Sequence, residues 1–147
     1  MTKALSFFKL HPEARLPTRS HSLDAGLDLY ALEASTIHEG ETVKVRTGIG
    51  VDMRGHAPCV GLIKDRSSLA ARGLRVSGGV VDAGYLGELV VLLSSERGLH
   101  NLGPGTRVAQ LVVMPTLQLE PKLMAAPAAA PDLDSRGSKG FGSSGEK

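Results

Sequence analysis

Apolar residues along the chain fall into short runs of the kind that form β-strands. Between residues 42 and 47, apolar and polar residues alternate with period two, which is typical of a strand with one buried face. Residues 89–93 and 108–114 are continuous apolar runs rich in β-branched residues, as in strands that are covered on both faces. These segments are therefore predicted to build the core.

Turn signals punctuate the chain at intervals of about ten residues. Glycine-containing turn segments lie at residues 39–40, 54–55, 77–79 and 103–105. This rhythm is typical of a sandwich or barrel, and the 18 Gly and 8 Pro among 147 residues favour the same all-β class. One short helix is predicted at residues 67–73, where two serines open an Ala/Leu segment that a glycine ends.

The length of 147 residues corresponds to one domain plus a tail. Beyond Pro121 the sequence becomes rich in Ala and Pro and then in Gly and Ser, without an apolar period. A segment of that composition cannot pack a core of its own. We therefore predict a β-barrel domain at residues 1–121 and a flexible C-terminal arm at residues 122–147.

The charged and reactive residues exclude several classes of function. Seventeen Lys and Arg against fifteen Asp and Glu give a net charge of +2, and no basic block alternates with aromatics, so a nucleic-acid partner is not expected. A single Cys59 excludes an internal disulfide, and the five His show no metal-ligand spacing. Neither a secretory leader nor an apolar stretch of about 18 residues occurs. We expect a cytoplasmic protein without a membrane partner.

Two polar segments stand where they could bind a ligand. Asp28 lies within the apolar segment 25–31, where a carboxylate needs a cation or hydrogen-bond donors, so it is either an edge-strand acid or part of a site. Arg66, Ser67 and Ser68 open the predicted helix, which brings a guanidinium, two hydroxyls and free backbone N–H groups together. That combination suits a phosphate, although a plain helix cap with a surface arginine has the same pattern.

A third segment, residues 78–88, has the pattern of a strand, a turn and a strand. Asp82 at the turn could act as a general base and Tyr85 could stack on a sugar or base; the alternative is a turn aspartate with a packing tyrosine. Gln110 interrupts an apolar strand and needs a hydrogen-bond partner in the backbone, in another subunit or in a ligand.

The C-terminal segment 136–145 carries two cations, several hydroxyls and Phe141. It contains a formal GxGxxG pattern, but no strand precedes it and only two residues follow it, so a dinucleotide site is not predicted. The segment is either a disordered terminus or a lid that closes over a base and its phosphates.

In chain order, these segments resemble the motifs of the trimeric dUTP pyrophosphatase (dUTPase) family. The five look-alikes are AGLDLYA, DRSSLA, GVVDAGYLGE, GTRVAQLV and RGSKGFGSSG. The resemblance implies a jelly-roll-like β-barrel and a homotrimer whose active sites are shared between subunits. It also implies Mg²⁺-assisted hydrolysis of dUTP to dUMP and pyrophosphate, a reaction that limits uracil incorporation into DNA and supplies dUMP for dTTP synthesis.

The resemblance also implies roles for the candidate residues. Asp82 would activate a water for attack at the α-phosphorus, and Tyr85 would pack on the deoxyribose. Asp28 would hold Mg²⁺ through water. The other substrate-binding residues would be Arg66, Ser67, Ser68, Gln110 and Arg136 at the phosphates, and Gly79, Val80, Val81, Phe141 and Gly142 around the base.

The chain departs from the family pattern at several positions. Asp65 and Ser68 replace the usual Pro and Gly of the second motif, and no Asn lies near Val76. Leu86 replaces a residue that is commonly polar. These departures bear on affinity and on the strictness of base selection.

Two other functions are compatible with the same fold. A dCTP deaminase has a similar RSSLA segment, but it needs a proton-shuttling Glu where this chain has Leu92, and a hydrocarbon cannot transfer a proton. A noncatalytic nucleotide-binding regulatory protein would keep the pocket without turnover.

Overall fold

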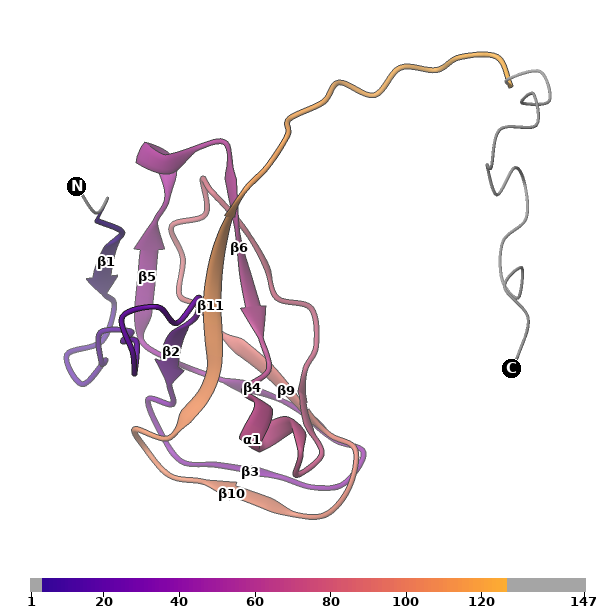
Figure 1. Ribbon diagram of the computed structural model, residues 1–147. Helices are drawn as coiled ribbons and strands as arrows, with labels where there is room; N and C mark the ends of the chain where they lie inside the picture. The colour runs from indigo at the N-terminus through magenta and orange to yellow at the C-terminus, as the bar shows by residue number, and fades with distance from the viewer. Residues whose placement is uncertain (1–3, 127–147) are drawn as a thin grey trace.

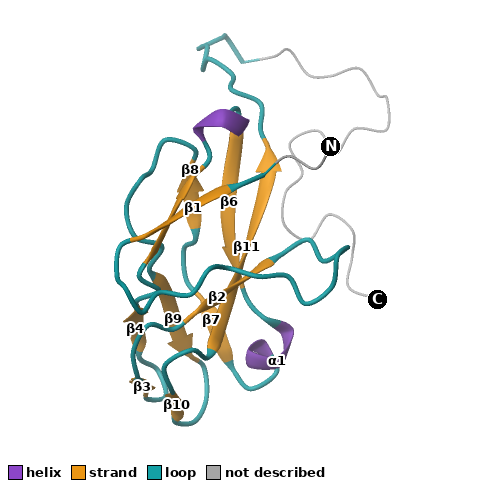
Figure 2. Ribbon diagram, turned by 90° about the vertical axis from the view of Figure 1, so that its left-hand side faces the viewer, coloured by secondary structure: helices purple, strands orange, loops and turns teal. Residues whose placement is uncertain are grey.

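Short antiparallel strands dominate the computed structural model, which describes residues 4–126 (Figure 1). The strands are β1 (Ser6–Lys9), β2 (Leu27–Tyr30), β3 (Ser35–Ile37), β4 (Thr42–Val45), β5 (Ile49–Asp52), β6 (Cys59–Lys64), β7 (Leu74–Val76), β8 (Val80–Asp82), β9 (Val91–Ser95), β10 (His100–Leu102) and β11 (Arg107–Pro115). The helical segments are the 3₁₀ helix η1 (Arg54–His56) and the α-helix α1 (Ser67–Ala70) (Figure 2). The predicted all-β class with one short α-helix is confirmed. Within residues 4–126, no helix is long and apolar enough to cross a membrane.

The strands form four antiparallel sheets. The largest has the order β2-β11-β6-β8, the second has the order β4-β9-β7, and β1-β5 and β3-β10 form separate pairs. β11 is the longest strand and lies between β2 and β6 across the middle of the molecule (Figure 1). Its Gln110 stands opposite Asp28 on one side and Lys64 on the other. β11 therefore joins the segments that carry the candidate phosphate-binding residues.

Strand alternation separates the core from the candidate site. In β2, Leu27 and Leu29 are buried and Asp28 between them points to the opposite face, because successive strand residues alternate sides. In β11, Ala109 and Leu111 are buried, while Gln110 is partly exposed. The core draws fully buried side chains from both larger sheets and from β5, among them Leu29, Val45, Ile49, Val51, Leu74, Val91, Leu93 and Leu111.

The structure corrects the ends of the predicted strands. The strand predicted at 42–47 ends at Val45, because Thr47 leaves the ladder and its hydroxyl donates to the carbonyl of Leu89 at 2.6 Å. The strand predicted at 89–93 begins at Val91, since the Leu89 N–H donates to Ile49 outside a regular ladder. The apolar run at 108–114 is confirmed as part of β11.

The predicted helix is real but shorter than expected. Its regular part is α1, and the chain then turns through residues 71–73. Arg66 is the residue that caps the helix, with no side-chain capping bond, so Ser67 and Ser68 belong to the first turn and do not cap it. Their hydroxyls therefore remain available to a ligand.

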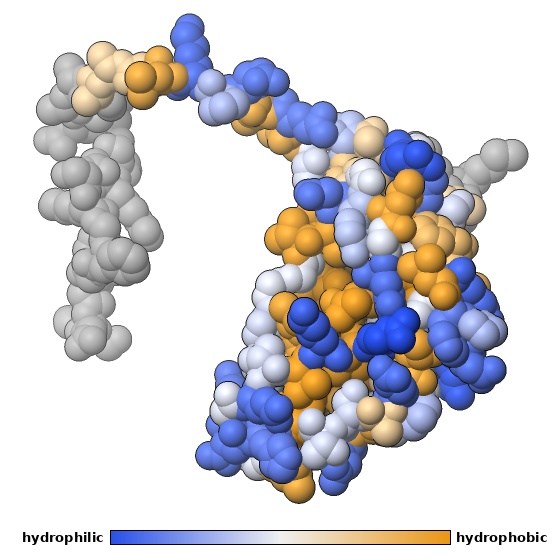
Figure 3. All heavy atoms as spheres, turned by 180° about the vertical axis from the view of Figure 1, so that it is seen from behind, coloured by the Kyte–Doolittle hydropathy of each residue, from blue (hydrophilic) through white to orange (hydrophobic). Residues whose placement is uncertain are grey.

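β11 continues into an extended segment, residues 116–126, that leaves the body of the molecule (Figure 1). Its large apolar side chains are exposed, with Leu117 at 84% and Leu123 at 99%. Figure 3 shows apolar and hydrophilic residues alternating along this segment.

Candidate active site

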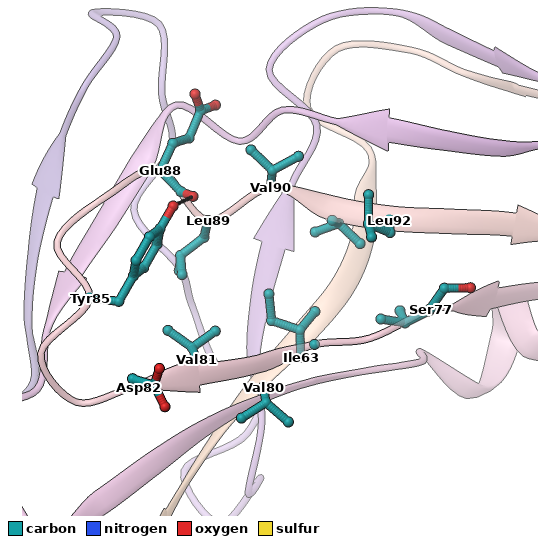
Figure 4. Close-up of a pocket in the computed structure, with 13 residues that line it drawn as sticks. Ile63, Ser77, Val80, Val81, Asp82, Tyr85, Glu88, Leu89, Val90 and Leu92 are labelled. Atoms are coloured by element: carbon teal, nitrogen blue, oxygen red, sulfur yellow. Dashed lines mark hydrogen bonds between the residues drawn. The ribbon is translucent and has the colours of Figure 1, made fainter.

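The hairpin residues that the sequence singles out line one pocket of about 220 Å³ (Figure 4). Gly79, Val80, Val81 and Asp82 come from β8 and the turn before it, and Tyr85 comes from the turn after it. The other walls are largely apolar. The structure therefore brings together all the hairpin residues of the predicted site.

Gly79 gives this pocket its shape. Its φ of +101° lies in a region that side chains disfavour, and a Cβ would stand 2.5 Å from the carbonyl oxygen of Ile63. The Gly79 carbonyl accepts a hydrogen bond from the Ile63 N–H at 2.7 Å. Only glycine lets the chain approach β6 this closely.

A tight turn holds Asp82 and Tyr85 at one end of the pocket (Figure 4). The Tyr85 N–H donates to the Asp82 carbonyl at 3.0 Å. The Tyr85 hydroxyl donates to the carbonyl of Glu88 at 3.0 Å, which fixes the ring. None of the labelled pocket side chains in Figure 4 hydrogen-bonds the exposed Asp82 carboxylate. That carboxylate is therefore available to accept a proton from a bound water.

Glu88 anchors the hairpin, a role that the sequence reasoning missed. Its Oε1 accepts hydrogen bonds from the N–H groups of Gly48 at 2.7 Å and Thr47 at 3.2 Å. Its Oε2 accepts from two guanidinium nitrogens of Arg46, at 3.1 and 3.2 Å. In the sequence, Glu88 is marked only as the carboxylate that ends the GVVDAGYLGE segment, directly before the apolar run at 89–93.

Four of the residues predicted at the phosphates, together with Asp28, line a second pocket of about 270 Å³. Asp28, Arg66, Ser67, Ser68 and Gln110 all contribute to it. A guanidinium and two hydroxyls at one opening supply the donors that an anionic oxygen needs. The structure therefore brings these three segments together at one pocket.

Asp28 lies between two arginines. Its Oδ1 accepts a hydrogen bond from Arg66 Nε at 3.1 Å, and its Oδ2 lies 3.4 Å from Arg107 Nη1. Arg107 also donates to the hydroxyl of Ser20 at 3.1 Å. The expected need of this carboxylate for a cation is confirmed. Arg107 contacts the site residue Asp28 without lining the pocket, a role that sequence reasoning missed although Arg107 lies within the GTRVAQLV segment.

Gln110 finds its partner in the backbone. Its Nε2 donates to the carbonyl of Asp65 at 2.8 Å. Its Oε1 occupies the space that a side chain at Gly26 would need. The glycine of the AGLDLYA segment thus makes room for the amide of the GTRVAQLV segment.

The two pockets do not form one centre within a single chain, because no residue lines both. Asp82 stands opposite Val60, which pairs with Met114, whereas Asp28 stands opposite Gln110. With about 3.3 Å per residue and 4.8 Å per strand, Asp82 and Asp28 lie roughly 20 Å apart across the sheet. The candidate base and the candidate phosphate-binding residues are therefore separated.

The donor set around Asp28 suits a magnesium ion that arrives with phosphates. Within residues 4–126, no three His, Cys, Asp or Glu side chains gather as a metal site. Mg²⁺ usually keeps several waters and takes one or two carboxylates plus substrate phosphates. The carboxylates of Asp28 and Asp24 line this pocket beside hydroxyl and amide oxygens, which fits that mode. Arg136, Phe141 and Gly142, the remaining predicted site residues, lie outside the described residues.

Comparisons of the sequence and the fold with known proteins agree on one family. A family model described as dUTPase matches residues 12–145. The chain is 40% identical to the deoxyuridine 5'-triphosphate nucleotidohydrolase of Mycobacterium marinum, over 99% of this chain and 97% of that protein. It is 35% identical to the variola virus protein of the same name, over 95% and 91%. A solved Staphylococcus bacteriophage 80alpha dUTPase with dUPNHPP has a TM-score of 0.88 at 28% identity and covers 99% of this chain and 100% of its own. The chain therefore belongs to the dUTPase family.

Proposed function

We propose that this chain is a dUTP diphosphatase, which hydrolyses dUTP to dUMP and pyrophosphate. The observation that carries the proposal is the hairpin pocket, in which the unengaged carboxylate of Asp82 lies beside the ring of Tyr85. Its relatives are named as deoxyuridine triphosphate nucleotidohydrolases, and the phage 80alpha relative was solved with dUPNHPP. Both facts support a deoxyuridine nucleotide as substrate.

Asp82 is the general base in this proposal. Its carboxylate accepts a proton from a water whose oxygen forms a bond to the α-phosphorus. The bond from that phosphorus to the bridging oxygen breaks, and pyrophosphate leaves with the bond electrons. The position of Asp82 at the rim of the pocket, without a cationic partner among the residues drawn in Figure 4, supports this role.

Arg66, Ser67 and Ser68 act on the phosphate chain. A triphosphate carries about four negative charges near neutral pH, which repel an incoming nucleophile until donors withdraw the charge. The guanidinium and both hydroxyls line the second pocket, and Gln110 lies beside them. Because Arg107 also lies close to the Asp28 carboxylate, Arg66 can turn toward an anion without leaving Asp28 unpaired.

The hairpin pocket selects the nucleoside. The backbone of Gly79, Val80 and Val81 offers fixed donors and acceptors to a base edge, and a base with the wrong pattern leaves polar groups unpaired. The ring of Tyr85 packs on the deoxyribose, where a 2′-hydroxyl would collide. These roles follow the family resemblance, and the shared lining of one pocket supports them.

Mg²⁺ belongs to the proposal as a cofactor that neutralises charge on the phosphates when bound. Asp28 would hold it through water, since its carboxylate faces the second pocket and keeps lone pairs beyond those that the two arginines use.

The assembly in this proposal is a homotrimer with shared active sites. The base and the phosphate-binding residues are separated within one chain, so a complete site needs the hairpin pocket of one copy and the phosphate pocket of another. The exposed leucines of residues 116–126 support contact between copies.

Arg136, Phe141 and Gly142 belong to the arm at residues 122–147, which closes over the substrate in the proposal. In this proposal the protein acts in the cytoplasm and binds neither a nucleic acid nor a membrane.

A product assay tests the reaction. Purified protein with Mg²⁺ is given dUTP, dTTP, dCTP or UTP, and pyrophosphate and ammonia are measured. Pyrophosphate from dUTP alone is expected. Ammonia from dCTP would identify a deaminase instead, a reaction that the apolar Leu92 in the wall of the hairpin pocket disfavours. Binding without either product would indicate the noncatalytic regulatory protein.

Mixed assemblies test the shared site. Asp82→Asn and Arg66→Ala variants are each expected to be inactive alone. Co-expressed, they should regain roughly a quarter of the wild-type activity, because random mixing pairs an intact hairpin pocket with an intact phosphate pocket at that frequency. No recovery in mixed oligomers would contradict sharing between copies.

A further inference from the structure

Asp65 lies between the two pockets without lining either of them. It follows β6 and directly precedes Arg66. Its Oδ1 accepts a hydrogen bond from the Val76 N–H at 2.6 Å, and its backbone carbonyl accepts from Gln110 Nε2 at 2.8 Å. One residue is therefore bonded to a wall of each pocket, since Val76 lines the hairpin pocket and Gln110 lines the phosphate pocket.

The bond to Val76 replaces a missing strand partner. β7 is at the edge of its three-stranded sheet and pairs only with β9. Edge strands carry N–H groups that no neighbouring strand can satisfy. The partly buried carboxylate of Asp65 takes the N–H of Val76, and this short bond to a charged acceptor is of the strong kind.

The same bond fixes the chain that enters the hairpin pocket. Ser77 follows Val76, lines the pocket and donates its N–H to the Leu92 carbonyl at 2.9 Å. Gly79 comes two residues later. Because both ends of the segment from Arg66 to Arg75 are tied at Asp65, a shift at the phosphate-binding loop is transmitted to the wall of the hairpin pocket.

Arg75 holds the carboxylate in place. Its Nη1 lies 3.5 Å from Asp65 Oδ2, and its Nε donates to Glu96 Oε1 at 3.1 Å. The side chains of this pair are 46% and 31% exposed, so Arg75 orients Asp65 more than it strengthens the bond to Val76.

We propose that Asp65 is a positioning residue for the nucleotide site, which sets the wall of the hairpin pocket at Val76 and Ser77 relative to the phosphate-binding loop. The inference rests on the proposed hydrolysis of dUTP. In this proposal Asp65 affects how the nucleotide fits and takes no part in making or breaking bonds. Loss of Asp65 therefore raises KM and weakens base selection.

Kinetics of Asp65 variants test the proposal. Asp65→Ala removes the acceptor and is expected to raise KM for dUTP about ten-fold, with kcat within about two-fold, and to lower the preference for dUTP over dCTP. Asp65→Asn keeps an oxygen acceptor for the Val76 N–H and is expected to restore most of the affinity. Glu96→Ala removes only the second partner of Arg75 and serves as the matched control with unchanged KM.

A purely structural role has a different signature. Loss of folded protein would lower kcat and leave KM and selectivity unchanged, and that result for Asp65→Ala would overturn the proposal. An inactive wild-type protein would instead contradict the proposed function.

Hydrogen exchange provides a test that needs no variant. In the wild-type protein, saturating dUMP with Mg²⁺ is expected to slow exchange of the Val76 and Ser77 amides by about ten-fold or more, because nucleotides bound at the two shared sites then order both ends of the link. Unchanged exchange at Val76 in the presence of bound dUMP would overturn the positioning role even if Asp65→Ala fails to fold.

Discussion

The hydroxyl of Tyr85 donates a hydrogen bond to the backbone carbonyl of Glu88, with 3.0 Å between the two oxygens. Tyr85 is 47% exposed, so burial alone does not fix its ring. The orientation of the ring beside Asp82 therefore depends largely on this bond, which ties it to the residue that anchors the hairpin.

Tyr85→Phe tests that dependence. The variant keeps the ring and loses one hydrogen bond, whose net contribution of about 1 kcal/mol predicts a fall of roughly five-fold in kcat/KM for dUTP. Because the ring can then tilt away from the sugar, the rate with UTP relative to dUTP should rise. The measurement is kcat/KM for both nucleotides, and an unchanged ratio would mean that the bond does not set sugar selection.

Glu88 is expected to contribute strongly to stability. Glu88→Ala leaves the N–H groups of Thr47 and Gly48 without their acceptor and should lower the free energy of unfolding by about 2 to 4 kcal/mol. Glu88→Gln keeps one oxygen acceptor and should lose less than half of that. Urea unfolding of the three proteins checks the order, and equal stability of Ala and Gln variants would contradict it.

Asp82→Asn should retain dUTP binding and abolish pyrophosphate release, because the shape of the side chain survives and its basicity does not. Binding is measured by calorimetry and turnover by pyrophosphate release. Asp52→Asn, which removes a carboxylate on β5 away from both pockets, is the control and should turn over normally. Wild-type turnover by Asp82→Asn would refute its role as the base.

Deleting residues 136–147 removes Arg136, Phe141 and Gly142. We expect the oligomer to remain folded and turnover to fall by about a hundred-fold or more, since the proposed lid no longer covers the substrate. Size-exclusion chromatography checks the assembly, and pyrophosphate release checks turnover. If the truncated protein keeps its activity, the arm is not a lid.

Asp52 and Arg54 predict one feature of acid unfolding. Hydrogen bonds from Arg54 lower the pKa of Asp52 from 3.8 to about 2. A carboxylate whose pKa falls on folding stabilises the fold above its unfolded pKa, and that contribution disappears as pH falls from 3.8 through about 2. Wild type should therefore exceed Asp52→Asn in stability at pH 7, by a small and salt-sensitive margin, and lose that margin near pH 2. Denaturant unfolding at several pH values measures it.

The sequence predicted the parts of the site better than their arrangement. Local patterns sufficed for the hairpin around Asp82 and for the short helix after Arg66, because turns and helix starts depend on neighbouring residues. The hydrogen bond from the Gly48 N–H to Glu88 joins residues 40 positions apart in the sequence. The contact of Arg107 with Asp28 likewise depends on how the strands pair. Such contacts have no signature in a single sequence, because the register of the sheet decides them.

The departures from the family pattern show the same limit. Asp65 stands out in the sequence as an extra carboxylate beside a phosphate site, yet the structure bonds it to a backbone N–H and to Arg75. The separation of Asp82 from Asp28, roughly 20 Å by strand spacing, was not visible in the sequence either, since motif order along a chain does not report which motifs meet.

The separation of the two pockets has a consequence for mixed populations of chains. If each copy contributes its hairpin pocket to one active site and its phosphate pocket to another, a chain defective in both pockets inactivates two active sites at once. In cells that make normal and doubly defective chains in equal amounts, activity should drop well below one half, so that the defect behaves as dominant.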